Sequence, residues 1–417
     1  MDKKKSIILI LGGIIVILII ALYFYFRTST VAPVPVNNIP DTSTGFGNTS
    51  ANINTSNGNG FGTSSNSSGT LVNSSTTQAQ LKQIFSEPNA GAVIFKSGGE
   101  EKIRLVEKSN GHIQEASFVS SQVVRISNTT IPKIYEALWD KTGGKVVLRY
   151  IKDETGKMQT YSAKINVSTS TSNESVGIIS GTFLPENIRE LSVNKNISKV
   201  FYLMETSNGG SAGFTANLDG TQSKQVFSSE LKNWNIGWAG DNTLSLLSRP
   251  SYTLKNILFS QNASGGSLEK IIGNMYGMTT LVGDNGNKVV YSQNVRSVPT
   301  LGYYNVKTDV DNNLSLSTIA DKCVWSNVSA NIVYCAVPKT MPRFSYPDDW
   351  YKGKVSFSDD FWQINLDNNT TTLLYQTKGN ENVDATNLIA SAKDDYIVFT
   401  NKKDLSLWSF KTSPQTN

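Results

Sequence analysis

The stretch SAKDDYIVFTNKKDLSLWSF, residues 391–410, contains the features that decide the fold of this 417-residue chain. A polar turn leads into the apolar strand YIVFTN, and the turn NKKD then leads into a second strand, LSLWSF. Short strands separated by Asn, Asp and Gly turns are typical of antiparallel β-sheet. Similar runs precede it at AVIF, KVVLRYI, KVFYLM, LSLLS, KVVYSQ and NIVYCAV. The region beyond residue 79 is therefore predicted to be all-β.

The apolar strands recur along the chain at similar positions within repeating units. An apolar residue or tryptophan stands before the polar turn in six units, at Trp139, Leu191, Trp238, Val282, Trp325 and Ile389. Successive anchors are 52, 47, 44, 43 and 64 residues apart, and an earlier unit, SEPNAGAVIF, precedes them. Seven units with a period of roughly 40–50 residues predict a seven-bladed β-propeller. Two β-sandwiches are the alternative, but they give less reason for seven in-phase units.

The chain ends predict how the ring closes. The last unit offers three strands, near residues 387–391, 396–400 and 405–410. The first strand after residue 79, QLKQIF at residues 80–85, is the expected fourth partner. Borrowing this N-terminal strand would leave no open sheet edge. The propeller is predicted over residues 79–412, followed by a tail at 413–417.

The last unit resembles a known repeat, and so does NISKVFYLMETSNGGSAGFTANLDG at residues 196–220. The order of elements in these units resembles that of TolB-type and WD40-like propeller blades. A strand ending in Ser or Trp is followed by an Asp-containing turn, an apolar strand and a Tyr/Trp strand. The layout of the whole chain is similar to that of membrane-anchored bacterial envelope proteins. The resemblance implies a fold and brings no activity with it, because one fold hosts many functions.

The N-terminal region predicts a membrane anchor. Residues 6–26, SIILILGGIIVILIIALYFYF, are 21 uncharged residues, and a helix of this length spans about 31 Å, close to the hydrocarbon core. Three lysines precede it and one arginine follows, which places residues 1–5 in the cytoplasm. We expect a single-pass protein of the cytoplasmic membrane with an extracytoplasmic C-terminal domain. A cleaved signal peptide, the alternative, has a shorter apolar core and a small-residue cleavage site.

Residues 27–78 form a different kind of segment. Asn, Ser, Thr and Gly dominate, and charged residues are nearly absent. Such a composition buries too little apolar surface to offset the entropy of ordering, so a disordered linker is predicted.

Composition excludes several classes of function. The chain has one histidine, His112, and two cysteines, which argues against His-based hydrolysis and against zinc sites. Its net charge of +5 is concentrated before residue 28, so nucleic acid is not an expected partner. Asp309, Asp311 and Asn313 have the spacing of a calcium loop, but Leu314 replaces the expected glycine. No metal or other cofactor is predicted.

The cysteines predict one disulfide. Cys323 and Cys335 flank the turn SNVSAN. If Trp325 faces Val333 across this hairpin, the same register opposes the two cysteines at about 4.5 Å between Cα atoms, within disulfide range. An extracytoplasmic location allows the bond to persist. Two buried free thiols are the alternative.

The long spacing between the last two anchors marks a candidate binding site. The excess lies in residues 336–364, which are rich in proline, aromatic residues and aspartate pairs. Long loops on rigid scaffolds often carry function. Exposed rings beside carboxylates suit a sugar or a peptide, whereas the alternative is that the rings pack inside the propeller. The predicted binding residues are Tyr346, Asp348, Asp349, Trp350, Tyr351, Phe361 and Trp362.

The predicted function is non-enzymatic. A tethered propeller presents a rigid face, which suits a binding or scaffolding module for an envelope protein or glycan. The alternative is a carboxylate-dependent carbohydrate-active enzyme, because a glycosidase needs two acids and no histidine. Asp349 with Asp360, or Glu186 with Glu190, would then be the pair of acids.

Overall fold

The computed structural model describes residues 79–413, apart from residues 121, 168–176, 196 and 241. All of them belong to the compact unit Ser74–Asn417. The predicted cytoplasmic residues 1–5, the anchor 6–26, the linker 27–78 and residues 414–417 of the tail lie outside the described residues. Within the described part of the chain, no helix is long and apolar enough to cross a membrane.

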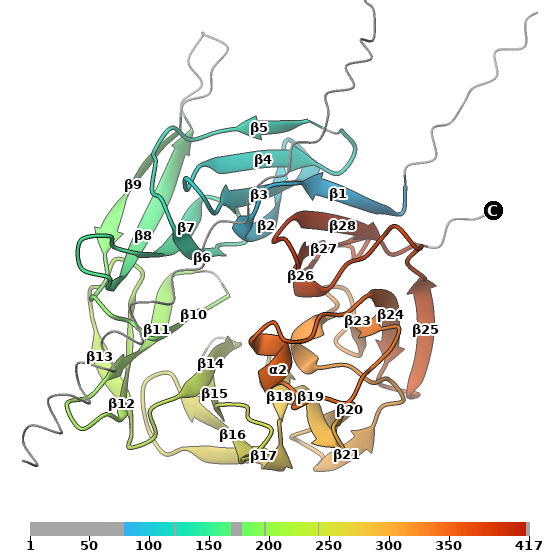
Figure 1. Ribbon diagram of the computed structural model, residues 1–417. Coiled ribbons are helices and arrows are strands. Elements are labelled where there is room, and N and C mark those ends of the chain that lie inside the picture. The colour runs from blue at the N-terminus through green and yellow to red at the C-terminus, as the bar shows by residue number, and fades with distance from the viewer. Residues whose placement is uncertain (1–78, 121, 168–176, 196, 241, 414–417) are drawn as a thin grey trace, which may run out of the picture. The chain divides into compact units, whose positions relative to one another are not determined.

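The unit is a seven-bladed β-propeller, as predicted (Figure 1). Each blade is a four-stranded antiparallel sheet. The first blade contains β2 (Asn89–Ser97), β3 (Glu100–Glu107), β4 (Ile113–Ser117) and β5 (Val123–Arg125). The second contains β6 (Ile134–Trp139), β7 (Lys145–Ile151), β8 (Met158–Val167) and β9 (Gly177–Phe183). The third contains β10 (Glu190–Val193), β11 (Lys199–Glu205), β12 (Ser211–Asn217) and β13 (Lys224–Ser229).

The next three blades continue in chain order. The fourth blade contains β14 (Trp234–Ala239), β15 (Thr243–Ser248), β16 (Lys255–Asn262) and β17 (Glu269–Tyr276). The fifth contains β18 (Thr279–Val282), β19 (Lys288–Val295), β20 (Val298–Asn305) and β21 (Val310–Asn313). The sixth contains β22 (Cys323–Trp325), β23 (Ile332–Pro338), β24 (Asp359–Asn365) and β25 (Thr370–Tyr375). The 3₁₀ turn η1 (Ala320–Lys322) precedes β22, and the short helix α2 (Asp348–Tyr351) lies between β23 and β24.

The seventh blade closes the ring with strands from both ends of the chain. It contains β26 (Ala385–Ala390), β27 (Tyr396–Asn401), β28 (Leu407–Lys411) and β1 (Leu81–Phe85). β1 pairs antiparallel with β28, and Leu81 opposes Phe410 (Figure 1). The prediction that the N-terminal strand supplies the fourth strand is therefore confirmed.

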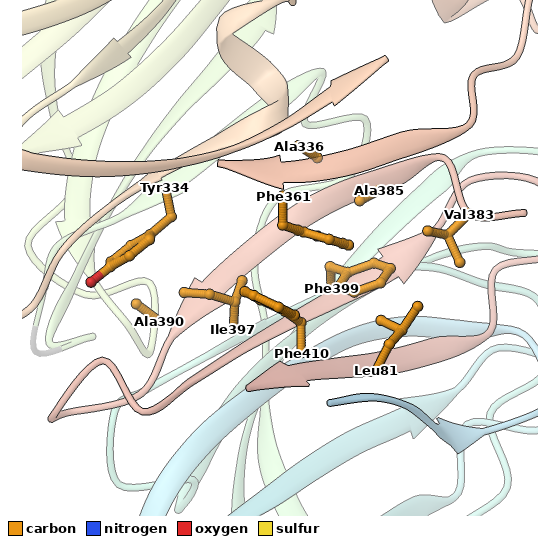
Figure 2. Packing of buried hydrophobic residues seen from close by; sticks show 10 residues of the cluster. All are labelled: Leu81, Tyr334, Ala336, Phe361, Val383, Ala385, Ala390, Ile397, Phe399 and Phe410. Carbon is orange, nitrogen blue, oxygen red and sulfur yellow. The ribbon is translucent and has the colours of Figure 1, made fainter. Parts of the chain in front are cut away.

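The core lies between neighbouring blades. The second strand of a blade has buried residues on both faces, as in KVFYLME of β11, because each sheet is packed between two others. Figure 2 shows one such layer between the sixth and seventh blades. The ring of Phe361 stacks on Phe410 with centroids 4.7 Å apart and lies 5.1 Å from the ring of Phe399.

The predicted disulfide is present. Cys323 of β22 opposes Cys335 of β23, with their Cα atoms 4.1 Å apart, and the two sulfurs are bonded. The bond joins the innermost strand of the sixth blade to the second strand.

The first strand in each of blades one to seven lies nearest the ring axis. Contacts join β2 to β6, β10 to β14, β22 to β26 and β26 to β2. The ring therefore has two faces. We call the face where these inner strands end, at turns such as 140–144, 194–198 and 283–287, the turn face. The opposite face, where the inner strands begin, carries residues 339–358 between β23 and β24, and we call it the insertion face.

Candidate functional site

The insertion, residues 339–358, lies against loops of several blades on the insertion face. The backbone N–H of Tyr252, in the fourth blade, donates to Asp348 Oδ2 over 2.6 Å. Asn294 Nδ2 of the fifth blade donates to the Tyr346 carbonyl over 2.9 Å. The sequence placed the excess at residues 336–364, but its two ends belong to strands β23 and β24. Phe361 and Trp362 are therefore strand residues.

Three of the seven predicted binding residues are buried. Tyr346 is 1%, Trp350 2% and Phe361 2% exposed. Tyr346 and Trp350 pack with Val355 and Phe357 in one apolar cluster, while Phe361 belongs to the layer between the last two blades. These contacts favour the packing alternative for the three rings.

The other predicted residues of the loop have different environments. Asp349 accepts a hydrogen bond from the Ser345 backbone over 3.0 Å and pairs with Lys354 over 3.2 Å. The Ser345 hydrogen bond and the Lys354 ammonium lower the pKa of Asp349. Tyr351 is 38% exposed, and its hydroxyl donates to Asp321 over 3.1 Å. Trp362 is partly exposed. A ligand-binding role for the exposed members remains a prediction.

A buried ion cluster fixes the insertion to the ring. Lys322, at the end of η1, is fully buried. Its Nζ lies 2.8 Å from Asp359 Oδ2 and 2.5 Å from Asp384 Oδ1, and it donates to the Ala385 carbonyl over 2.9 Å. Both carboxylates are themselves fully buried. Such a cluster persists because each charge has a partner of opposite sign.

Asp384 connects this cluster to the insertion. Its carboxylate accepts hydrogen bonds from Trp350 Nε1 over 3.1 Å, Ser356 Oγ over 3.1 Å and the Phe357 backbone over 3.0 Å. Burial alone would raise the pKa of Asp384, but the attraction of Lys322 and these donors hold it below its ordinary value. The insertion is thus held by a carboxylate that lies just before β26 of the next blade.

Asp359 differs from Asp384. Burial, together with repulsion from Asp384, raises its pKa to about 6, although Lys322 opposes the shift. Its Oδ2 accepts from the Ala385 backbone over 2.7 Å, while Oδ1 is buried without a partner among the described residues. The cluster is structural, because its three charged side chains are fully buried and bond one another and the insertion.

The acids considered for glycosidase chemistry have different environments. Asp360 accepts from the Thr377 backbone over 2.8 Å. Glu186 forms an exposed ion pair with Lys157 over 3.4 Å. Burial raises the pKa of Glu190, although the Arg149 guanidinium opposes this shift.

The calcium-like spacing forms an ordinary turn. Asp309 accepts from the Tyr304 hydroxyl over 2.8 Å, and Asp311 accepts from the Tyr291 hydroxyl over 2.6 Å. Among the residues that the structure describes, no three acidic, histidine or cysteine side chains gather to hold a metal.

The turn face contains a large open basin, which the sequence did not predict. Its volume is about 920 Å³. Its walls come from the ends of β2, β18, β22 and β26 and are largely apolar. We call this cavity the turn-face basin; its partly exposed apolar wall residues include Ile94, Leu281, Val324, Trp325, Leu388 and Ile389.

Charged residues surround these walls, and lysines predominate. They are Lys96, Lys141, Lys195, Lys288, Glu101 and Asp284. Glu101 accepts a hydrogen bond from the Ala392 backbone over 2.8 Å, and Asp284 forms an ion pair with Lys195. Lys96 and Lys141 have no ion pair with any residue that the structure describes.

Lys141, Lys195 and Asp284 come together although they belong to three blades. Each is the second residue after its inner strand, in blades two, three and five. The corresponding residue of blade four, at position 241, lies outside the described residues. Burial lowers the pKa of Lys141, and the nearby Lys195 lowers it further. The in-phase lysines in DKTGGK and NKNISK were the sequence signal that could have indicated this site.

Comparisons with known proteins support the fold. No family model matches the chain, and no curated protein does. Among solved structures, an oligogalacturonate lyase in complex with manganese is similar with a TM-score of 0.52 and 11% identity, over 81% of this chain and 91% of that one. The β-propeller domain of the Trilobed protease from Pyrococcus furiosus has a TM-score of 0.49 and 10% identity over 80% and 99%.

TolB from Acinetobacter baumannii is also similar, with a TM-score of 0.42 and 9% identity over 77% of this chain and 79% of that one. At these identities, the likeness to the lyase shows the fold alone. The chain is a seven-bladed β-propeller.

Proposed function

We propose that the chain is a membrane-anchored, extracytoplasmic binding or scaffolding module for an envelope protein or polymer, without a catalytic step. Residues 6–26 would hold it in the cytoplasmic membrane, and residues 27–78 would separate the propeller from the bilayer. The Cys323–Cys335 disulfide is consistent with an oxidising compartment.

One observation carries the proposal: the turn-face basin. Its volume of about 920 Å³ lies within the range of about 300–1,000 Å³ that is usual for ligand sites. Its walls are inner strands of the propeller, and three of its four lysines, Lys96, Lys141 and Lys288, form no ion pair among the described residues. A rigid apolar cavity with a few charged groups is suited to binding.

The acids argue against the glycosidase alternative. A glycosidase places one acid on each side of a bound sugar, about 5–9.5 Å apart. Asp349 and Asp360 instead accept hydrogen bonds from backbone N–H groups, and the carboxylates of the turn-face basin are occupied by Lys195 and the Ala392 backbone. Binding therefore accounts better for this arrangement.

Site-specific photocrosslinking tests the proposal in cells that express the full chain. A photoreactive benzoylphenylalanine replaces Val328, a basin-lining residue that is 67% exposed, or Tyr351 on the insertion face. The control position is Leu373, 42% exposed on the outermost strand of the sixth blade. We expect one specific envelope partner from position 328 and none from position 373.

Two results would contradict the proposal. One is that positions 328 and 351 give the same unspecific adducts as position 373. The other is that the purified full chain releases shortened products from envelope glycans, and that Asp349→Asn with Asp360→Asn abolishes this release. A partner crosslinked only from position 351 would retain the module and assign its contact to the insertion face.

A further inference from the structure

Three inner strands each present to the turn-face basin one edge that pairs with no neighbouring strand in the described residues. At the end of β26, the Ala390 carbonyl accepts a hydrogen bond from Asn327 Nδ2 over 2.8 Å. Within the described residues, β18 pairs only with β19, β22 only with β23 and β26 only with β27. The other edge of each of these strands faces the axis and lines the basin. Open strand edges present N–H and C=O groups that pair with an added extended chain. This feature favours a polypeptide over a glycan or a lipid.

The walls between these edges suit apolar side chains. Leu281 of β18, Val324 of β22 and Leu388 of β26 are only partly buried and line the basin. Side chains along an extended peptide alternate in direction, so every second one would contact such a wall. A short apolar segment therefore fits the basin.

The charges give the segment a direction. Lys141 and Lys195 lie near each other on the rim, with Asp284 as the nearby carboxylate. Two ammonium groups with one opposing carboxylate leave a positive charge that an incoming carboxylate can neutralise. Lys96, on the same basin, adds a further cation without an ion pair in the described part of the chain. A peptide carries one obligatory carboxylate, at its C-terminus.

We infer that the turn-face basin receives the C-terminal end of a partner polypeptide, whose extended apolar residues lie along the inner strand edges and whose terminal carboxylate is bound by Lys141 and Lys195. The inference rests on the proposed binding function and names the part of the partner that is recognised. It assigns specificity to lysines in the turns of the second and third blades.

Two matched peptide pools test it against the full chain in detergent. Both contain fluorescein-labelled hexapeptides with Val, Ile, Leu or Phe at the last four positions. One pool ends in a free carboxylate and the other in an amide. Fluorescence polarisation should show at least fivefold tighter binding of the free-acid pool, because only that pool supplies the anion.

Variants locate the effect. Lys141→Gln with Lys195→Gln should remove the difference between the two pools and leave the residual binding of the amide pool. The control is Lys270→Gln with Lys307→Gln, because both lysines are exposed, one on the outer strand β17 and one in the β20–β21 turn. The control pair should bind both pools as the unchanged chain does.

Equal binding of the acid and amide pools would overturn the inference. So would an equal loss in the basin and control variants. Binding of inorganic polyphosphate with the same lysine dependence, when both peptide pools fail, would replace the peptide with an acidic polymer. If neither pool binds but position 328 still crosslinks to a partner, the inference is wrong while the proposed function stands. If crosslinking fails from positions 328 and 351 as well, both are wrong.

Discussion

The two faces of the propeller use charge in opposite ways. On the insertion face, Lys322 is fully buried between Asp359 and Asp384, and Asp384 also accepts from Trp350. On the turn face, the side chain of Lys195 is 44% exposed and that of its partner Asp284 is 70% exposed. Buried charges without their partners are strongly unfavourable, whereas exposed ones are screened by water. The insertion is therefore held by buried charges, whereas the charges of the turn face remain accessible to solvent.

The largest effect expected is from Lys322→Met. The substitution leaves two buried carboxylates without their cation, and breaking such a cluster costs about 3–5 kcal/mol. Urea unfolding followed by tryptophan fluorescence measures the change in the free energy of unfolding. The matched control is Lys133→Met, because its ion pair with Asp153 is exposed, and it should cost about 1 kcal/mol or less. If Lys322→Met and Lys133→Met lower the free energy of unfolding by similarly small amounts, the contrast between buried and exposed charges would be contradicted.

Next in size is the difference between two adjacent rings of the insertion. Trp350→Ala removes a buried ring and a hydrogen bond to Asp384, so it should lower the free energy of unfolding by about 3–4 kcal/mol. Tyr351→Ala removes a ring that is 38% exposed, and its expected cost is about 1 kcal/mol. The same unfolding measurement compares them. A larger loss for Tyr351→Ala would show that the exposed ring, and not the buried one, fixes the loop.

These residues show where sequence patterns stop being informative. Strand periodicity is local and recurs in every blade, and counting strands in the last unit was enough to predict that the 80–85 segment closes the ring. The burial of Trp350 depends on contacts with residues far along the chain, and Lys322 and Asp384 are separated by 62 residues. In the sequence these two look like ordinary polar residues beside strands. Patterning therefore predicts the scaffold but not which polar groups its packing brings together.

The disulfide extends the comparison, because β22 reaches from the buried cluster to the turn-face basin. Cys323 directly follows Lys322, and Trp325, at the other end of the strand, lines the basin. Replacing both cysteines by alanine should cost about 2–3 kcal/mol for so short a loop. Alkylation without reduction, followed by mass spectrometry, should find neither cysteine labelled. Two labelled cysteines would contradict the bond.

The pH dependence of the buried cluster is expected to be smaller. The pKa of Asp359 rises from 3.8 to about 6 in the folded chain, so the folded state binds this proton more tightly than the unfolded state does. Its contribution to stability is fully present below about pH 4 and is lost as pH rises through 6. Asp359→Asn retains an acceptor for the Ala385 backbone. In the unchanged chain, the free energy of unfolding should fall by on the order of 1–2 kcal/mol between pH 4 and pH 7. The Asp359→Asn variant should not show this fall.

Asp384 has the opposite sign, because its pKa is lowered. Its contribution is present above its ordinary pKa and is lost as pH falls through the folded value. The free energy of unfolding of the unchanged chain minus that of Asp359→Asn isolates the effect of Asp359 above pH 4. We expect this difference to fall as the pH rises. A difference that instead rises with pH would contradict the assignment.

The smallest effect on stability is expected on the turn face. Lys141→Gln with Lys195→Gln removes one exposed ion pair, with Asp284, and one repulsion between neighbouring ammonium groups. These contributions are small and opposite in sign, so the free energy of unfolding should change by about 0.5 kcal/mol or less. Urea unfolding checks this expectation. A loss above about 2 kcal/mol would make the rim lysines structural, like Lys322, and the difference between the two faces would disappear. If stability is unchanged while crosslinking from position 328 is lost, those lysines serve recognition.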